Sequence, residues 1–190
     1  TLADRFMRSR LSQGVEEITA LYEALDLAQA AREVYELVWS EFCDWYLEAA
    51  KPALKAGNAH TLRTLEEVLA VLLKLLHPMM PFLTSELYQA LTGKEELALE
   101  AWPEPGGRDE EAERAFEALK QAVTAVRALK AEAGLPPAQE VRVYLEGETA
   151  PVGENLEVFR FLARADLLPE RPAKALVKAM PRVTARMPLE

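Results

Sequence analysis

Apolar residues recur every three or four positions through most of the first hundred residues of this chain, which is the spacing of helices with one buried side. Asp26 can cap the start of the second such segment, and Pro52 stands just beyond its expected end. Gly93 ends the last segment. The pattern therefore predicts helices over about 4–25, 26–50, 61–76 and 81–91.

The stretch "LLHPMMPFLTSELY", residues 75–88, places two prolines three residues apart in a segment that is otherwise almost wholly apolar. Proline removes a backbone N–H and fixes φ, so Pro78 has to end a helix, while Pro81 is tolerated in the first turn of the next one. Linkers are normally polar, whereas this one carries Met79, Met80 and Phe82. We therefore expect a corner between two packed helices that turns inside the core.

Beyond residue 100 the pattern changes. The segment "AWPEPGG", 101–107, breaks any helix with two prolines and two glycines. Val141, Val143 and Leu145 then alternate with polar neighbours, which is the period of a half-buried strand. We expect a helix over about 109–133, a strand over 140–148, a helix over 155–168 and two short strands within 174–189.

These elements predict a mainly α fold: an antiparallel helical bundle followed by a small α/β module. The bundle is expected over residues 1–104, a linker and connecting helix over 105–138, and a small β-α-β-β module over 139–190. The chain begins without a methionine, already in a helix-like sequence, and we interpret it as part of a longer protein.

Composition narrows the class of protein further. Half of the 190 residues are apolar, which suffices for a core, but no apolar run approaches the ~20 residues of a membrane span. Cys43 is the only cysteine, so no internal disulfide can form, and we expect a cytosolic, monomeric protein with no membrane association. The net charge of −9 disfavours a nucleic-acid partner without excluding one, because a local site is independent of the global charge.

The sequence carries no recognisable catalytic or metal-binding motif. There is no G-x-G fingerprint and no phosphate-binding loop. His60 and His77 are the only histidines, and neither is paired with a nearby cysteine in the way metal ligands are. Cys43 stands among aromatic residues in a helix, where a small buried hydrophobe is the default interpretation. We expect no catalytic centre, no metal and no cofactor within these residues.

The stretch "VWSEFCDWYLEAAKP", 38–52, is richer in recognition chemistry. At ~100° per residue its packing face is expected to include Val34, Tyr35, Phe42, Trp45 and Tyr46, along with Ala31, Val38 and Ala49. Leu47 lies on the opposite side, with Ser40, Asp44 and Lys51 as polar neighbours and Trp39 and Cys43 along the flank.

Two interpretations of Leu47 stay open at this point. Single exposed leucines are common on protein surfaces, and Leu47 can also pack against an element outside this chain. Alternatively, Leu47 and Trp39 offer an apolar surface on which an unstacked base can lie. Asp44 and Lys51 can then form hydrogen bonds with the edge of that base, as in the recognition of single-stranded RNA.

Several segments resemble a known family. "LHPMMPFLTSELY" resembles the H-P-[FM]-[MT]-P-F-[IL]-[ST]-E-E-[LI]-[WY] signature in the helical anticodon-binding domain of class I aminoacyl-tRNA synthetases for valine, isoleucine, leucine and related amino acids. "EFCDWYLEAAKP" is most similar to the version found in the valine-specific members. "AWPEP" and "VRALKAEAGLPPAQEVRVYL" resemble later family segments, so the likeness covers essentially the whole chain. Ser85 departs from the usual Glu at a solvent-side position.

This resemblance implies the anticodon-binding region of a valyl-tRNA synthetase, an enzyme that joins valine to tRNA(Val) using ATP with Mg and clears mischarged threonine. The adenylate-forming and editing residues are absent here, so that chemistry is expected elsewhere in the same chain, together with the remaining synthetase domains. By resemblance Leu47 falls on the helix that faces the anticodon. Trp39, Ser40, Asp44 and Lys51 are the other expected tRNA contacts.

Basic residues further along the chain are weaker candidates. Arg127 and Lys130 are spaced i, i+3 on the expected connecting helix, and we expect them to serve domain packing or the tRNA backbone. The distal module has an excess of basic residues that can touch phosphates or simply be solvated; they are Arg160, Arg164, Lys174, Lys178, Arg182 and Arg186.

A different class of function also fits the sequence. An acidic helical bundle can be a protein-interaction or scaffold module that uses the Trp39–Leu47 flank as a groove for a partner. The two functions differ in their response to salt, because binding through phosphates weakens steeply as salt rises.

Overall fold

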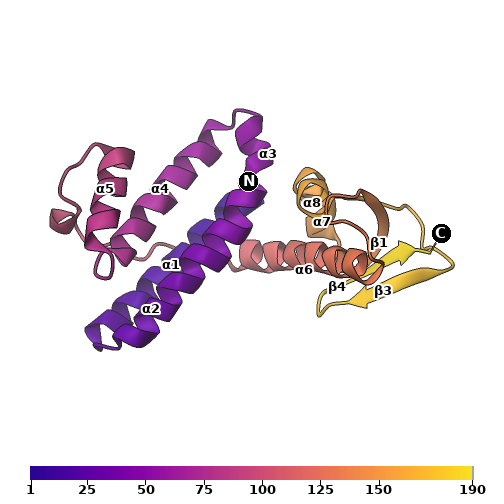
Figure 1. The fold of residues 1–190 in the computed structure, drawn as a ribbon, viewed down its shortest axis with the longest axis horizontal. Coiled ribbons are helices and arrows are strands. Elements are labelled where there is room, and N and C mark those ends of the chain that lie inside the picture. The colour runs from indigo at the N-terminus through magenta and orange to yellow at the C-terminus, as the bar shows by residue number, and fades with distance from the viewer. Residues whose placement is uncertain (190) are drawn as a thin grey trace. The chain divides into compact units, whose positions relative to one another are not determined.

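The computed structural model describes residues 1–189 and divides into two compact units. The first holds essentially residues 3–112, and the second runs from residue 113 to the end of the chain. The first unit is helical, and the second contains a small four-stranded sheet with its helices (Figure 1). The expected fold class, a helical bundle followed by a small α/β module, is confirmed. None of the helices within residues 1–189 is both long enough and apolar enough to span a membrane.

The helices of the first unit follow the local signals in the sequence. Thr1 and Asp4 form a capping box, the Asp26 carboxylate accepts the backbone N–H of Gln29 at 3.0 Å, and the Asn58 side chain caps the third long helix. The elements are α1 (Leu2–Glu23), α2 (Leu27–Tyr35), the π-helical η1 (Glu36–Leu47), α3 (Glu48–Lys55), α4 (Ala59–Leu76), α5 (Pro81–Thr92) and the 3₁₀ turn η2 (Leu97–Leu99).

The second helix extends beyond its predicted end and is not a regular α-helix throughout. It was expected to end near residue 50, but α2, η1 and α3 follow one another without a break, and Pro52 lies inside α3. Proline clashes with the carbonyl four residues earlier in a regular α-helix. That residue here is Glu48, the junction between the π-helical segment and α3, where the hydrogen-bond pattern changes.

A buried polar cluster joins three helices of the first unit. The Asp4 side chain of α1 is only 2% exposed and accepts hydrogen bonds from the Tyr46 hydroxyl of η1 at 2.9 Å and from the Thr61 hydroxyl of α4 at 2.8 Å. Gly14 lets α1 approach η1 closely, since an added Cβ there would lie 2.6 Å from a Leu37 methyl group. The apolar core of the first unit includes Ile18, Val34, Leu72 and Leu75.

The proline corner was expected to be buried, and that expectation is wrong. Phe82 is 91% exposed, and Met80, Leu83 and Leu87 are each close to half exposed. Helices α4 and α5 do pack on each other, but through Leu73 and Tyr88, which form a separate small cluster with Leu97. The corner itself therefore turns on the surface, and its apolar side chains face outward.

The second unit is built on a mixed sheet. Its helices are α6 (Glu110–Glu132), which starts at the end of the first unit, α7 (Ala150–Glu154) and α8 (Leu156–Ala163). Its strands are β1 (Val141–Gly147), β2 (Ala165–Leu167), β3 (Ala175–Ala179) and β4 (Val183–Pro188), in the order β2-β1-β4-β3. Strand β1 pairs parallel with β2 and antiparallel with β4.

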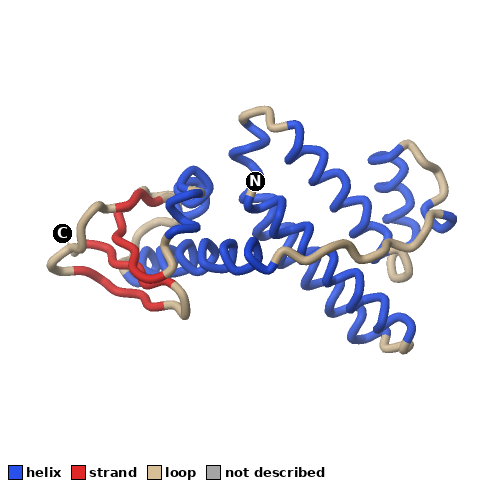
Figure 2. The backbone as a smooth tube through the Cα atoms, turned by 180° about the vertical axis from the view of Figure 1, so that it is seen from behind, coloured by secondary structure: helices blue, strands red, loops and turns tan. Residues whose placement is uncertain are grey.

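Strand β2 was missed by the sequence analysis, which extended the helix to residue 168. The helix ends at Ala163 because Arg164 adopts the left-handed conformation, with φ of 50°. Residues 165–167 then pair with 141–143 of β1. The red strands lie beside α6 in Figure 2, and the Gln121 side chain of α6 accepts the backbone N–H of Arg182 at 2.8 Å.

Candidate nucleic-acid interface

The π-helical segment η1 changes which residues of the second helix face the core. Val34, Leu37, Phe42 and Tyr46 are buried, with a five-residue step between Leu37 and Phe42. A π-helix forms i→i+5 hydrogen bonds, so a projection at the α-helical angle drifts out of phase along it. Phe42, Tyr46, Val34 and Ala49 are buried as expected, whereas Tyr35 and Ala31 were expected on the packing face and are exposed.

The outward side of this helix carries a row of apolar residues four positions apart, which we call the apolar stripe: Leu27, Ala31, Tyr35, Trp39, Cys43 and Leu47. Leu27 and Tyr35 are each 59% exposed and Trp39 is 54% exposed, while Cys43 and Leu47 are half-buried. The rings of Tyr35 and Trp39 are stacked, with centroids 6.4 Å apart and planes inclined by 14°. A flat aromatic platform of this kind can support an unstacked base.

Leu47 lies at the end of the apolar stripe and is reachable from solvent, although part of its side chain is covered. Asp44 is exposed beside it. The Ser40 hydroxyl donates a hydrogen bond to the Glu36 carboxylate at 2.8 Å, and the Lys51 ammonium forms an ion pair with the Glu48 carboxylate. Ser40, Asp44, Leu47 and Lys51 follow one another at three- or four-residue steps along the helix. Because η1 forms i→i+5 hydrogen bonds, these steps do not place all four residues on one side of it.

Cys43 has the properties of a structural residue. Its side chain is half-buried, and burial, followed by the negative charge of Asp44, raises the pKa of the thiol. The thiolate, which is the nucleophilic form, is thereby disfavoured at neutral pH.

The surroundings of the apolar stripe are acidic. Residues 26–51 contain six Asp or Glu against two basic residues, Arg32 and Lys51. Because phosphates are anionic, this surface suits contacts to base faces and base edges better than contacts to an RNA backbone.

Arg127 and Lys130 serve the packing of the second unit. The Lys130 side chain is 2% exposed, and its ammonium donates to the carbonyl oxygens of Ala163 at 2.8 Å, Arg164 at 3.0 Å and Pro137 at 3.3 Å. Arg127 donates to the carbonyl of Leu162 at 3.1 Å. Both cations thus meet the carbonyl end of α8, where the helix dipole favours positive charge. Of the two roles expected for Lys130, the enclosed ammonium favours packing over contact with the tRNA backbone.

Several basic residues of the distal module are bound to carboxylates. Arg160 pairs with Asp166 at 2.9 Å, Arg182 with Glu148 at 2.9 Å, and Arg186 with Glu146 at 3.0 Å. These pairs partly neutralise the basic excess that the sequence showed. Lys178 is exposed on β3.

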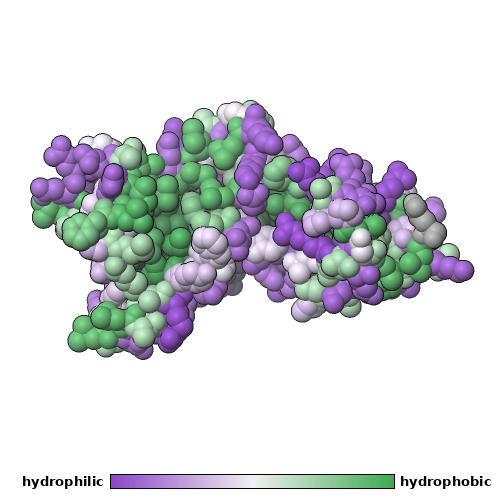
Figure 3. All heavy atoms as spheres, in the orientation of Figure 1, coloured by the Kyte–Doolittle hydropathy of each residue, from purple (hydrophilic) through white to green (hydrophobic). Residues whose placement is uncertain are grey.

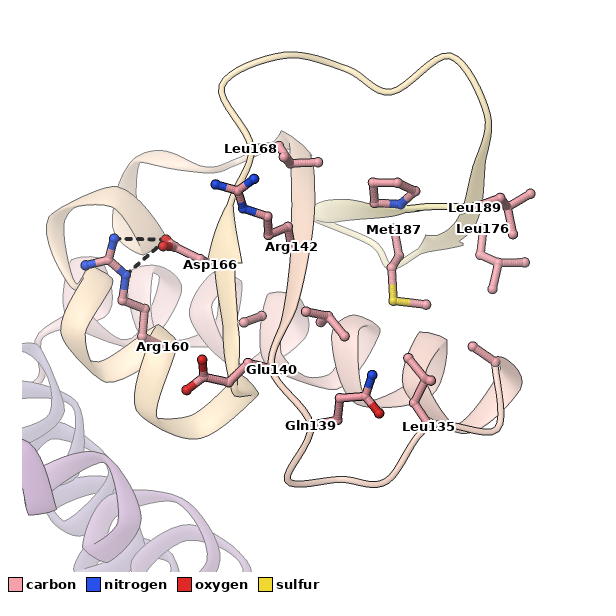
Figure 4. A pocket seen from close by; sticks show the side chains of 14 residues that line it. Leu135, Gln139, Glu140, Arg142, Arg160, Asp166, Leu168, Leu176, Met187 and Leu189 are labelled. Carbon is pink, nitrogen blue, oxygen red and sulfur yellow. Dashed lines mark hydrogen bonds and ion pairs between the residues drawn. The ribbon is translucent and has the colours of Figure 1, made fainter.

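The second unit also contains a cavity of about 910 Å³ (Figure 4). Arg142 and the Arg160–Asp166 pair stand on one side of it, and Leu176 and Met187 on the other. Within residues 1–189, no group of three or more His, Cys, Asp or Glu side chains is arranged to hold a metal ion.

The sequence of the chain matches a family described as the anticodon-binding domain of tRNA ligase, over residues 4–145. The chain belongs to this family. It is 98% identical over its whole length of 190 residues to a valine–tRNA ligase of Thermus thermophilus, of which it covers 22%. It is 46% identical over 193 aligned positions to the enzyme of that name from Deinococcus radiodurans, covering 21% of that protein, and 43% identical over 157 positions to the one from Thermotoga maritima.

The chain thus spans about a fifth of the length of these relatives. The resemblance stated from the sequence motifs is confirmed. Tyr35 and Leu27 were not predicted as surface residues, although they precede Trp39 by four and twelve positions, in step with the four-residue repeat. What hid them was the assumption of a regular α-helix through residues 36–47.

Proposed function

We propose that this chain is the anticodon-binding part of a valine–tRNA ligase and that the side of α2, η1 and α3 bearing Leu47 receives unpaired nucleotides of tRNA(Val). The observation that carries the proposal is the exposed Trp39 ring, which is stacked on Tyr35 and lies on the same rigid helix as Leu47 and Asp44. Family membership and the names of the relatives support it.

The chemistry of such a site is recognition without catalysis. Leu47 and the ring of Trp39 supply apolar surface for the faces of unstacked bases, and the Asp44 carboxylate can accept hydrogen bonds from exocyclic amino groups. Ser40 and Lys51 add a hydroxyl and a cation along the same run of helix. Because these groups are held on a helix, little conformational freedom is lost on binding.

The complete enzyme would use ATP with Mg to attach valine, through residues outside this chain. Residues 1–190 contain no phosphate-binding loop and no dinucleotide fingerprint. Their contribution would be to select the tRNA that reaches the reaction, in a protein that is monomeric.

The test is Leu47→Ala in the full-length ligase. We expect aminoacylation of tRNA(Val) to fall roughly tenfold, since a contact between one base and one side chain is worth about 1–3 kcal/mol, while ATP-dependent activation of valine stays unchanged. Leu99→Ala, which truncates a leucine that is 79% exposed on η2, serves as the matched control.

Equal loss of both activities in Leu47→Ala would indicate a folding defect and count against the proposal. A second readout uses tRNA(Val) transcripts with altered anticodon bases. If Leu47 contacts the anticodon, the variant discriminates less between these transcripts than the parent enzyme does.

The apolar stripe with its acidic surroundings also favours a second candidate function, docking of a protein partner along the Trp39–Leu47 flank. Footprinting of tRNA(Val) with the full-length enzyme distinguishes the two. Protection of the anticodon loop that disappears in Trp39→Ala supports tRNA binding, whereas protection that is unaffected by this substitution favours the protein partner.

A further inference from the structure

The outward-facing corner between α4 and α5 carries an apolar surface that the proposed anticodon site does not use. We call it the α5 patch and define it as Met80, Phe82, Leu83 and Leu87. These side chains are 46%, 91%, 49% and 47% exposed, respectively. Leu83 and Leu87 lie at i and i+4, and therefore on one side of α5, while Met80 is the residue that precedes the helix and Phe82 stands in its first turn.

The α5 patch belongs to a wider apolar region of the first unit. Figure 3 shows hydrophobic residues gathered on the face over α4 and α5. A contiguous apolar surface on a folded protein marks a place of contact with something else, because its exposure to water is unfavourable.

The backbone under the α5 patch is firmly held. The Thr84 hydroxyl donates to the carbonyl of Met80 at 2.8 Å and lies 2.8 Å from Nδ1 of His77, so one hydroxyl joins both sides of the corner. One turn later, buried Tyr88 anchors α5 against Leu73. The patch is thus presented in a defined conformation, as a surface for a specific contact requires.

Charge indicates which kind of partner this surface fits. Residues 77–100 contain four glutamates and a single basic residue, Lys94. The Lys94 ammonium is itself bound to Glu100 at 2.8 Å. An RNA backbone would meet anionic side chains without a free cation in this segment, so a polypeptide surface is the better match.

We propose that the α5 patch is the docking surface for the catalytic portion of the same ligase chain, which lies outside residues 1–190. The chain covers only 22% of a relative to which it is 98% identical, so most of such a polypeptide is available to cover the patch. A unit that holds a tRNA while another portion of its chain acts on that tRNA needs a fixed geometry between the two, and a rigid apolar contact provides it. This inference rests on the proposed function only in taking the chain to be part of a ligase.

The experiment places the photoreactive residue p-benzoylphenylalanine at position 82 of the full-length ligase and maps the cross-links by mass spectrometry. We expect an intramolecular cross-link to a segment of the catalytic portion, at equal yield with and without tRNA. The same residue at position 99, which is also exposed in the first unit, is the control and should not cross-link to that segment.

Cross-linking of position 82 to tRNA, to a second copy of the protein, or to nothing beyond residues 1–190 would overturn the inference. The photoreactive residue at position 39 separates this outcome from the proposed function, since that position should cross-link to tRNA. A cross-link at 82 to the catalytic portion together with none at 39 to tRNA would leave the docking surface standing and count against the anticodon site.

A second measurement is independent of the photochemistry. Phe82→Ala in the full-length ligase is expected to speed amide hydrogen exchange several-fold in the catalytic segment identified by the cross-link, whereas Leu99→Ala leaves it unchanged. Unaltered exchange in Phe82→Ala would show that Phe82 does not contact that segment.

Discussion

Asp4 shows how a single buried carboxylate can organise the first unit. Burial alone would raise the pKa of this group, but hydrogen bonds from Thr1, Thr61 and Tyr46 stabilise the carboxylate more strongly, and the pKa of Asp4 is lowered below its ordinary value of 3.8. Burial, followed by the hydrogen bond to Asp4, raises the pKa of the Tyr46 hydroxyl far above its usual range. The pair therefore remains Asp⁻ and neutral Tyr throughout the physiological range.

Removal of the Tyr46 hydroxyl tests this cluster. Tyr46→Phe keeps the ring in the core but leaves one oxygen of buried Asp4 without its donor, so we expect the free energy of unfolding to fall by about 1–3 kcal/mol. Tyr35→Phe removes a hydroxyl from an exposed ring and should change the free energy of unfolding by less than about 0.5 kcal/mol. Denaturant unfolding of the chain measures both, and equal effects would show that Asp4 does not depend on Tyr46.

The lowered pKa of Asp4 also predicts a dependence of stability on pH. The unfolded state binds a proton at Asp4 more readily than the folded state does, so the stabilisation is fully present above the ordinary pKa of 3.8 and is lost as the pH falls through the lower folded value. We expect Asp4→Asn to reduce the loss of stability between pH 5 and about pH 2, an interval set by this linkage. Asp44→Asn, at an exposed position, is the control. Parallel pH profiles for the parent and Asp4→Asn would contradict the assignment.

Among whole elements, the π-helical segment η1 has the largest consequence for the candidate site. Its i→i+5 hydrogen bonds shift the buried row from the α-helical phase and bring Tyr35 to the surface, where it stacks on Trp39. π-Helical turns are frequent at functional sites. In this chain the irregularity accompanies the stacked Tyr35–Trp39 pair on the helix that also carries Leu47.

Carbonyl groups at the C-terminal end of helix α8 accept hydrogen bonds from side chains of α6. Lys130→Met keeps much of the side chain's bulk but removes the ammonium that serves Ala163, Arg164 and Pro137. We expect the second unit to lose about 1–3 kcal/mol of stability, since a buried donor is lost to these carbonyl groups, although that of Arg164 keeps the backbone N–H of Val141. Lys178→Met, at an exposed position on β3, should be near neutral. Hydrogen exchange in α8 and β2 reports the difference.

Lys130→Met also separates packing from tRNA contact. If Lys130 neutralised a phosphate, the salt dependence of tRNA binding by the full enzyme would lose about one unit of slope. An unchanged slope together with lower stability is the outcome that the enclosed ammonium predicts.

At the scale of the whole molecule, negative charge is concentrated in the first part of the chain. Residues 1–107 contain 9 basic against 17 acidic residues, a net of −8, while residues 108–190 contain 13 against 14, a net of −1. If the first unit binds the anticodon, it does so with base contacts and without a strongly basic surface.

This charge distribution makes a prediction for binding by the full-length ligase. Leu47→Ala should weaken binding of tRNA(Val) by a similar factor at every salt concentration, because an apolar contact releases no counterions. The slope of log K against log salt is then the same for variant and parent. A slope that changes by about one unit or more would mean that the substitution disturbs phosphate contacts.

Much of the fold could be predicted because the signals concerned are local. Asp26 and Asn58 cap helices through their own side chains, Pro81 opens α5, and Gly93 adopts the left-handed conformation that ends it. Each of these outcomes depends on a few neighbouring residues. The identity of the family could be predicted for the same reason, since its motifs are short and contiguous.

Three features could not be predicted in this way. Strand β2 exists because residues 165–167 find hydrogen-bond partners on β1, about twenty positions away. Exposure of Phe82 and Leu83 depends on which side of α5 packs against Leu73. Enclosure of Lys130 requires the end of α8 to lie over α6.

The amino-acid sequence by itself determined most of the helices, several of their caps, the division between a helical part and a part with strands, and the family. Only the tertiary structure decided that η1 is π-helical, that Tyr35 and Trp39 are exposed and stacked on each other, and that the proline corner faces outward. The physical reason is that capping and helix periodicity arise from interactions within one or two turns. The side of a helix that becomes buried is instead settled by the packing partners it meets from distant parts of the chain.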